Sequence, residues 1–68
     1  MEIFAKRLRE LRKEKGYSQN DMANLLKIKQ QSYARYELNT SEPSYAMLVE
    51  ISNFFDVSCE YLLGKSDY

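Results

Sequence analysis

The spacing of apolar and small residues between Gln19 and Leu38 constrains the fold more than any other feature of the sequence. These residues follow two short helical patterns with an interruption at Lys27. The apolar and small positions are Met22, Ala23, Leu26, Ile28, Tyr33 and Tyr36. This spacing predicts two short helices joined by a tight turn, each with one buried side. Ala23 falls where the helices would pack most closely, which requires a small side chain.

A helix is predicted before this pair, over about residues 2–15, because apolar side chains there share one side. They are Ile3, Phe4, Leu8 and Leu11. Gly16 follows and can adopt the left-handed conformation that ends a helix. Ser18 then provides an N-cap for residues 19–26, and Asp21 lies at the third helical position, as in a capping box.

The remaining helices are predicted from similar signals. Residues 30–38 form the second helix of the pair, and the polar loop "NTSEPS" follows. Ser44 caps a helix over residues 45–55, and Ser58 caps the short stretch "CEYLLG", which ends at Gly64. No strand-like alternation occurs in the sequence. We therefore expect an all-α fold of five short helices, forming a single domain over residues 1–68.

Composition argues against several functional classes. The 68 residues include one cysteine and no histidine, which leaves neither a metal cluster nor a nucleophile–base pair. We therefore expect no enzymatic activity and no cofactor. No apolar run approaches the roughly 20 residues that cross a membrane, and the first ten residues lack the apolar core of a signal peptide. These features predict a protein of the reducing cytoplasm with no membrane partner.

The charges are unevenly distributed, although the net charge is zero. Residues 1–36 carry nine Lys or Arg against four acidic residues, a balance of +5, whereas residues 37–68 carry one Lys against six acidic residues, a balance of −5. This asymmetry indicates a basic face on one side of the molecule, as expected for a partner of nucleic acid.

One face of the helix over residues 30–38 combines side chains that can bind DNA bases. Gln30, Gln31 and Arg35 lie within about 140° of one another on a helical wheel, with Ala34 between them. In the major groove Gln can bond adenine and Arg can bond guanine, and a small neighbour allows close approach. An ordinary solvated helix face would have the same residue types. From these residues alone, both interpretations stay open.

The whole chain resembles the lambda-repressor-like helix-turn-helix family (Xre/Cro/C1-type regulators). The matching stretches cover about residues 3–64, and they are "RLRELRKEKGYSQNDMANLL", "IKQQSYARYE", "EPSYAMLVEIS" and "FFDVSCEYLLG". The resemblance implies a five-helix domain with residues 30–38 as the recognition helix. It also implies a sequence-specific double-stranded DNA-binding transcriptional regulator, with repression as the expected activity.

The family's DNA contacts can be transferred by position. The resemblance makes Gln30, Gln31 and Arg35 the expected base contacts. The expected phosphate contacts are Gln19, Lys29, Ser32, Asn39, Thr40 and Ser41. One recognition helix contacts few base pairs, so we expect a homodimer on two half-sites.

A structural ion pair between Arg12 and Glu37 is also implied by the resemblance. It would hold the first helix against the end of the recognition helix. Two positions depart from the family pattern, because Lys27 and Asn39 replace its usual glycines. Lys27 is therefore expected to adopt a positive φ, at a cost of about 1 kcal/mol.

The aromatic and sulfur-containing residues are interpreted mainly as core. Tyr33, Tyr36 and Tyr61 are expected to point inward, Tyr17 and Tyr45 to be partly buried, and Cys59 to pack as a small hydrophobe. A C-terminal apolar cluster could be either core or a dimer surface; it comprises Phe54, Phe55, Val57, Leu62 and Leu63. The alternative function is a protein-interaction module, an antitoxin-like or accessory partner of another protein, which keeps the fold, binds DNA little and acts through its acidic half.

Overall fold

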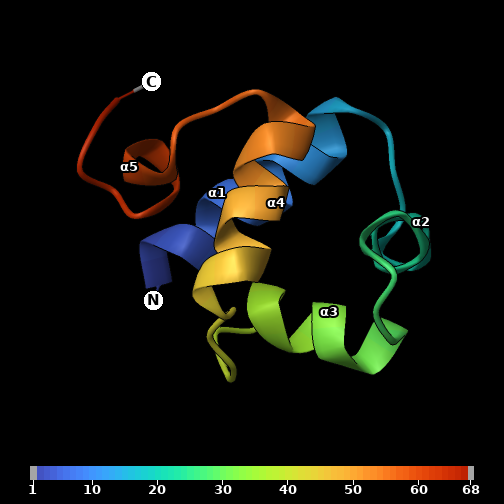
Figure 1. Cartoon of the computed structure of the whole chain (residues 1–68). Helices are drawn as coiled ribbons and strands as arrows, with labels where there is room; N and C mark the ends of the chain where they lie inside the picture. Colours follow the sequence, from blue (N-terminus) through green and yellow to red (C-terminus); the bar gives the residue numbers. More distant parts are fainter. Residues whose placement is uncertain (1, 68) are drawn as a thin grey trace.

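Five α-helices and no strand make up the computed structural model over residues 2–67, which are the residues that the structure describes (Figure 1). The helices are α1 Glu2–Glu14, α2 Gln19–Leu26, α3 Gln30–Glu37, α4 Tyr45–Phe55 and α5 Cys59–Leu62. The expected all-α architecture is confirmed, with the helix-turn-helix formed by α2 and α3. α1 and α3 each end one residue earlier than expected, and α5 ends at Leu62 rather than at the glycine.

Three serine side chains start helices as the sequence predicts. Ser18 forms a complete capping box, because its Oγ accepts a hydrogen bond from the backbone N of Asp21 at 3.0 Å and its own N donates to Asp21 Oδ2 at 2.9 Å. Ser44 and Ser58 cap α4 and α5 through bonds of 3.1 and 3.0 Å to backbone N–H groups three residues later.

Within residues 2–67, three residues other than glycine adopt the left-handed conformation after a helix. Lys27 has φ 60° at the turn between α2 and α3, and Asn39 has φ 61° after α3. A positive φ is expected at both positions, because they are the ones at which the family usually has glycine. Asp56, with φ 56°, ends α4 in the same way and has no counterpart among the sequence expectations. The turn after α2 remains well bonded, since Ile28 N donates to Ala23 O at 2.9 Å.

The five helices enclose one hydrophobic core. In Figure 1 α4 crosses in front of α1, while α3 runs beneath and α2 and α5 lie on opposite sides. The buried cluster comprises Phe4, Leu8, Met22, Ala23, Leu26, Tyr33, Leu48, Ile51, Phe55 and Leu62. No helix within residues 2–67 has both the length and the apolar character needed to cross a bilayer.

Two residues expected to be buried are exposed. Ile3 lies in the first turn of α1 and is 50% exposed, although one side of its side chain packs closely against the backbone of Gly64. Tyr45 is 81% exposed because it is the first residue of α4, at the outer end of that helix. Ala5, not Ile3, completes the buried side of α1.

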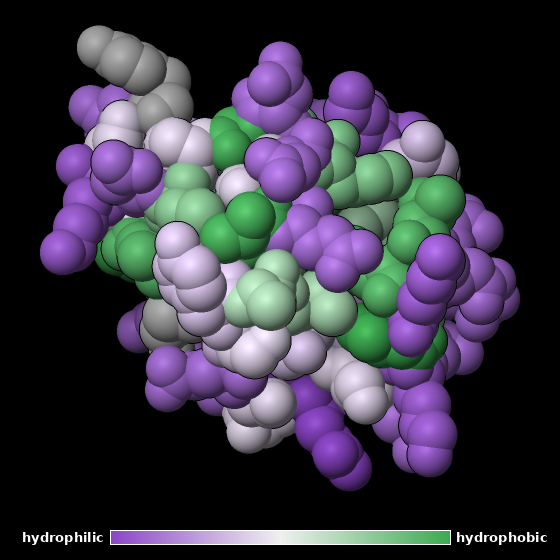
Figure 2. Space-filling model, viewed as in Figure 1, coloured by the Kyte–Doolittle hydropathy of each residue, from purple (hydrophilic) through white to green (hydrophobic). Residues whose placement is uncertain are grey.

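The C-terminal apolar cluster belongs mostly to the core. Phe55 and Leu62 are buried, and Phe54 and Val57 pack against the core. Phe54 also contacts the ring of Tyr17, with 5.9 Å between centroids. Only Leu63 of the five is exposed. Figure 2 shows apolar side chains at the surface near the turn between α2 and α3, and between α5 and the start of α1.

Candidate nucleic-acid interface

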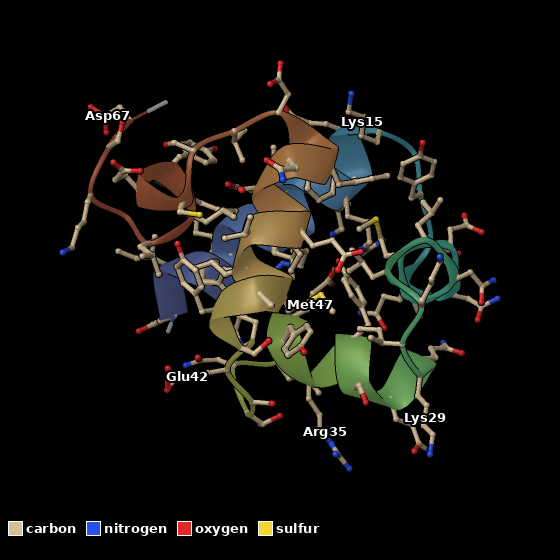
Figure 3. The ribbon with its side chains drawn as sticks, viewed as in Figure 1. Lys15, Lys29, Arg35, Glu42, Met47 and Asp67 are labelled. Atoms are coloured by element: carbon tan, nitrogen blue, oxygen red, sulfur yellow. The ribbon has the colours of Figure 1, made fainter. Side chains whose placement is uncertain are left out.

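The outer face of α3 presents the three expected base-contacting side chains to solvent. Gln30, Gln31 and Arg35 are all exposed, whereas Tyr33 on the opposite side is fully buried. Figure 3 shows the Arg35 side chain extending away from the domain at its lower edge. This face therefore has the amide and guanidinium groups of a major-groove recognition surface.

The residues expected to contact phosphates lie near both ends of α3. Lys29 is the N-cap residue of α3, and its exposed side chain extends away from the domain on the same side as Arg35 (Figure 3). Ser32 lies in the first turn and is half-buried. The others follow the end of the helix, where Asn39 and Thr40 are exposed and Ser41 is half-buried. Thr40 N donates to Arg35 O at 3.0 Å, which fixes the loop against the helix end.

A buried carboxylate holds the inner side of α3. Glu37 accepts hydrogen bonds from Arg12 Nε at 2.7 Å and from Arg12 Nη2 at 3.1 Å. Tyr33 O–H donates to the same carboxylate at 2.5 Å, and Gln19 Nε2 donates to it at 3.1 Å. Its side chain is 3% exposed. The carboxylate therefore connects α1, α2 and α3 at one point.

These contacts determine the protonation of the cluster. Burial alone would raise the pKa of Glu37, but the hydrogen bonds from Arg12, Tyr33 and Gln19 outweigh burial and lower it below its usual value. The hydrogen bond to Glu37 raises the pKa of Arg12. Burial, followed by the bond to Glu37, strongly raises the pKa of Tyr33. Arg12 and Glu37 are therefore charged and Tyr33 is neutral at physiological pH.

Gln19, an expected phosphate contact, is less accessible than expected and already has a hydrogen-bond partner within the protein. It is half-buried at the start of α2, and its amide nitrogen is already bonded to Glu37. Its contact with phosphate remains a prediction. Two further partners of Glu37, Tyr33 and Arg9, have no counterpart among the sequence expectations. Tyr33 lies one helical turn before it, a spacing that could have predicted the contact. Arg9 donates to the backbone O of Glu37 at 3.3 Å, and no sequence signal indicated this bond.

Comparison with known proteins agrees with this geometry. Residues 5–67 match the family model described as a helix-turn-helix domain, so the chain belongs to the helix-turn-helix family of lambda-repressor-like regulators. Among the relatives, the uncharacterized HTH-type transcriptional regulator YqaE of Bacillus subtilis is 44% identical over 66 residues, which are 96% of this chain and 57% of that protein.

Two further relatives derive from phages. The SPbeta prophage-derived uncharacterized HTH-type transcriptional regulator YonR of Bacillus subtilis is 43% identical over 61 residues, covering 90% of this chain and 56% of that protein. The cryptic phage CTXphi transcriptional repressor RstR of Vibrio cholerae is 26% identical over 65 residues, covering 96% of this chain and 59% of that protein. The chain thus spans little more than half the length of these relatives.

Proposed function

We propose that this domain binds double-stranded DNA in a sequence-specific manner as the DNA-binding part of a transcriptional regulator. The observation that carries this proposal is the exposed face of Gln30, Gln31 and Arg35 on a helix whose opposite side is anchored by the buried Glu37 carboxylate. A recognition helix needs polar side chains that can reach base edges and a backbone that does not move when they bind.

The proposed contacts divide by chemistry. Gln30, Gln31 and Arg35 contact bases in the major groove, where bidentate amide and guanidinium contacts distinguish base pairs. Contacts with phosphates position α3 on the duplex and carry no base preference. These phosphate contacts are assigned to Gln19, Lys29, Ser32, Asn39, Thr40 and Ser41. For Gln19 the contact requires its second amide hydrogen or its backbone, because one amide hydrogen is donated to Glu37.

Repression, dimerisation and location belong to the same proposal. The regulator is proposed to be a repressor, in keeping with the name of RstR. It acts as a homodimer, because one short recognition helix contacts few base pairs and a two-fold pair matches half-sites about one helical turn apart. It works in the cytoplasm, where bacterial DNA lies. No catalytic step forms part of the proposed function.

The rival is a protein-interaction module, an antitoxin-like or accessory partner of another protein, that keeps this fold and binds DNA little. The feature that favours it is the zero net charge of the chain. The dependence of affinity on salt separates the two functions, because phosphate contacts release counterions. For a dimer that neutralises roughly 6–10 phosphates, log affinity falls with log salt concentration at a slope of about −5 to −9. The rival predicts that the little duplex binding it retains responds hardly at all to salt, which gives a flat plot.

The measurement requires duplexes that the protein binds, and a matched charge control. Lys29→Ala removes a cation from the proposed interface and should reduce the magnitude of the slope by about one per protomer. Lys13→Ala removes an exposed cation from α1, outside the proposed interface, and should leave the slope unchanged. Equal effects of the two variants would contradict the assignment of this face.

A further inference from the structure

The loop after α3 carries no positive charge, although the proposed interface brings it close to phosphates. This loop covers residues 39–44, and its first three residues are assigned phosphate contacts. Residues 36–64 contain no Lys or Arg. The loop must therefore bind phosphates through neutral amide, hydroxyl and backbone groups. The residue that follows these three is acidic, since it is Glu42.

Glu42 is exposed in this loop, and its charge is not compensated within residues 2–67. Its side chain forms neither an ion pair nor a hydrogen bond with any other described residue. Figure 3 shows Glu42 at the lower side of the molecule, where Lys29 and Arg35 also lie. A duplex that docks on this side therefore meets an uncompensated carboxylate as well as the two cations.

The electrostatic field of the proposed interface changes sign along α3. Lys29 lies at the N-terminal end, where the backbone N–H groups of a helix also carry partial positive charge. The C-terminal end carries the opposite partial charge, and Glu42 adds a full negative charge in the loop that follows the C-cap Leu38. Phosphates are therefore attracted at the start of α3 and repelled beyond its end.

We propose that Glu42 limits the affinity of this domain for DNA, because it repels the phosphates that the loop approaches. This inference rests on the proposed function, since the repulsion needs a bound duplex. The repulsion acts on the DNA backbone, which is the same in every sequence, so it weakens binding to every duplex by a similar factor. Stable binding then depends more strongly on the base contacts of α3, and binding to unrelated DNA stays weak.

Fluorescence anisotropy of a labelled mixed-sequence duplex tests this role without knowledge of the operator. The 68-residue chain is titrated into the duplex at about 0.1 M salt. Glu42→Gln should tighten binding about threefold and Glu42→Lys about tenfold, because these changes first remove and then reverse a charge near phosphate. Glu42→Lys should also increase the magnitude of the salt slope by about one. A gain in affinity cannot result from loss of the fold.

Glu60→Gln is the matched control, because it makes the same change of charge elsewhere. Glu60 is exposed on α5, which lies on the side of the domain away from α3 (Figure 1). The domain extends 28 × 23 × 19 Å, whereas salt at about 0.1 M screens exposed charges beyond about 10 Å. The control should therefore bind the duplex as the wild type does.

The possible results separate this inference from the proposed function. Equal duplex affinity of the wild type and both Glu42 variants would overturn the inference and leave DNA binding intact. An equal gain from Glu60→Gln would also overturn it, because net charge alone would then explain the effect. Weaker binding by Glu42→Gln would overturn it as well, since the carboxylate would then accept a bond from DNA, such as one from cytosine. No duplex binding by any of these proteins would overturn both proposals.

Discussion

The guanidinium of Arg12 and the carboxylate of Glu37 meet side by side, with Nε–Oε2 at 2.7 Å and Nη2–Oε1 at 3.1 Å. The remaining guanidinium nitrogen, Nη1, donates to the backbone oxygen of Tyr17 at 2.9 Å. One side chain therefore joins α1 to the link before α2 and to the last residue of α3. This bidentate geometry fixes α3 at the end opposite to its glutamines.

Removing one partner of this pair should destabilise the fold severely. Arg12→Ala leaves the Glu37 carboxylate buried without its cation, and we expect a loss of about 3 kcal/mol in the free energy of unfolding. Urea unfolding at neutral pH measures the loss. Lys13→Ala, the exposed neighbour, should change stability by less than about 0.5 kcal/mol. Comparable stabilities of the two variants would show that the pair contributes little.

The pair should also make stability depend on pH in acid. The pKa of Glu37 is lower in the folded protein than its usual value of 4.5, so the folded state holds this proton less readily than the unfolded state. Its stabilising contribution is therefore full above about pH 4.5 and is lost as pH falls through the lower folded pKa. In Glu37→Gln this contribution is missing, and the stability difference from wild type should shrink in acid. A difference that stays constant down to about pH 2.5 would contradict the lowered pKa.

The turn between α2 and α3 carries strain that glycine would relieve. Lys27 has φ 60°, which costs a residue with a Cβ about 1–2 kcal/mol. Glycine avoids that cost but gains more freedom in the unfolded chain, so Lys27→Gly should stabilise by up to about 1 kcal/mol. Lys29→Gly, two residues later at φ −72°, has no such strain to lose and should not stabilise. Thermal unfolding of both variants compares them.

Gln19 is expected to have two roles, and its variants should show both. Gln19→Ala removes one hydrogen bond to Glu37, with a loss of about 1 kcal/mol in stability. If it also contacts a phosphate, affinity should fall by a similar factor for every duplex sequence. Asn20→Ala, the exposed neighbour, should leave stability nearly unchanged. A change in base preference with Gln19→Ala would contradict its assignment to phosphate.

Local signals in the sequence predict most of the fold. Ser18, Ser44 and Ser58 define where three helices begin, because capping depends only on residues within one turn. The exposure of Ile3 and Tyr45 was not predictable in this way. Each fits an apolar position on its own helix, but burial depends on what another helix places opposite. Ile3 lies over Gly64, a neighbour 61 residues away that periodicity cannot identify.

The features of the candidate site likewise differ in whether the sequence predicts them. The exposed face of Gln30, Gln31 and Arg35 follows from helical geometry and the inward position of the tyrosines. The hollow between the start of α1 and the end of α3 does not follow from it, because this hollow depends on how the end of α3 lies against α1. The bond from Gln19 to Glu37 likewise crosses from one helix to another. The spacing of residues along the sequence predicts contacts within a helix. Contacts between helices can be predicted only when the packing of the helices against one another is known.

Selection of bound duplexes from a random-sequence DNA pool tests the central claim most directly, with the wild type and Arg35→Ala examined in parallel. The account predicts a palindromic motif for the wild type, with half-sites about one helical turn apart. Arg35→Ala should lose preference at defined positions of each half-site, at a cost of roughly 1–3 kcal/mol. If the folded wild type enriches no motif at low salt, or if Arg35→Ala enriches the same motif unchanged, α3 does not recognise DNA through this face.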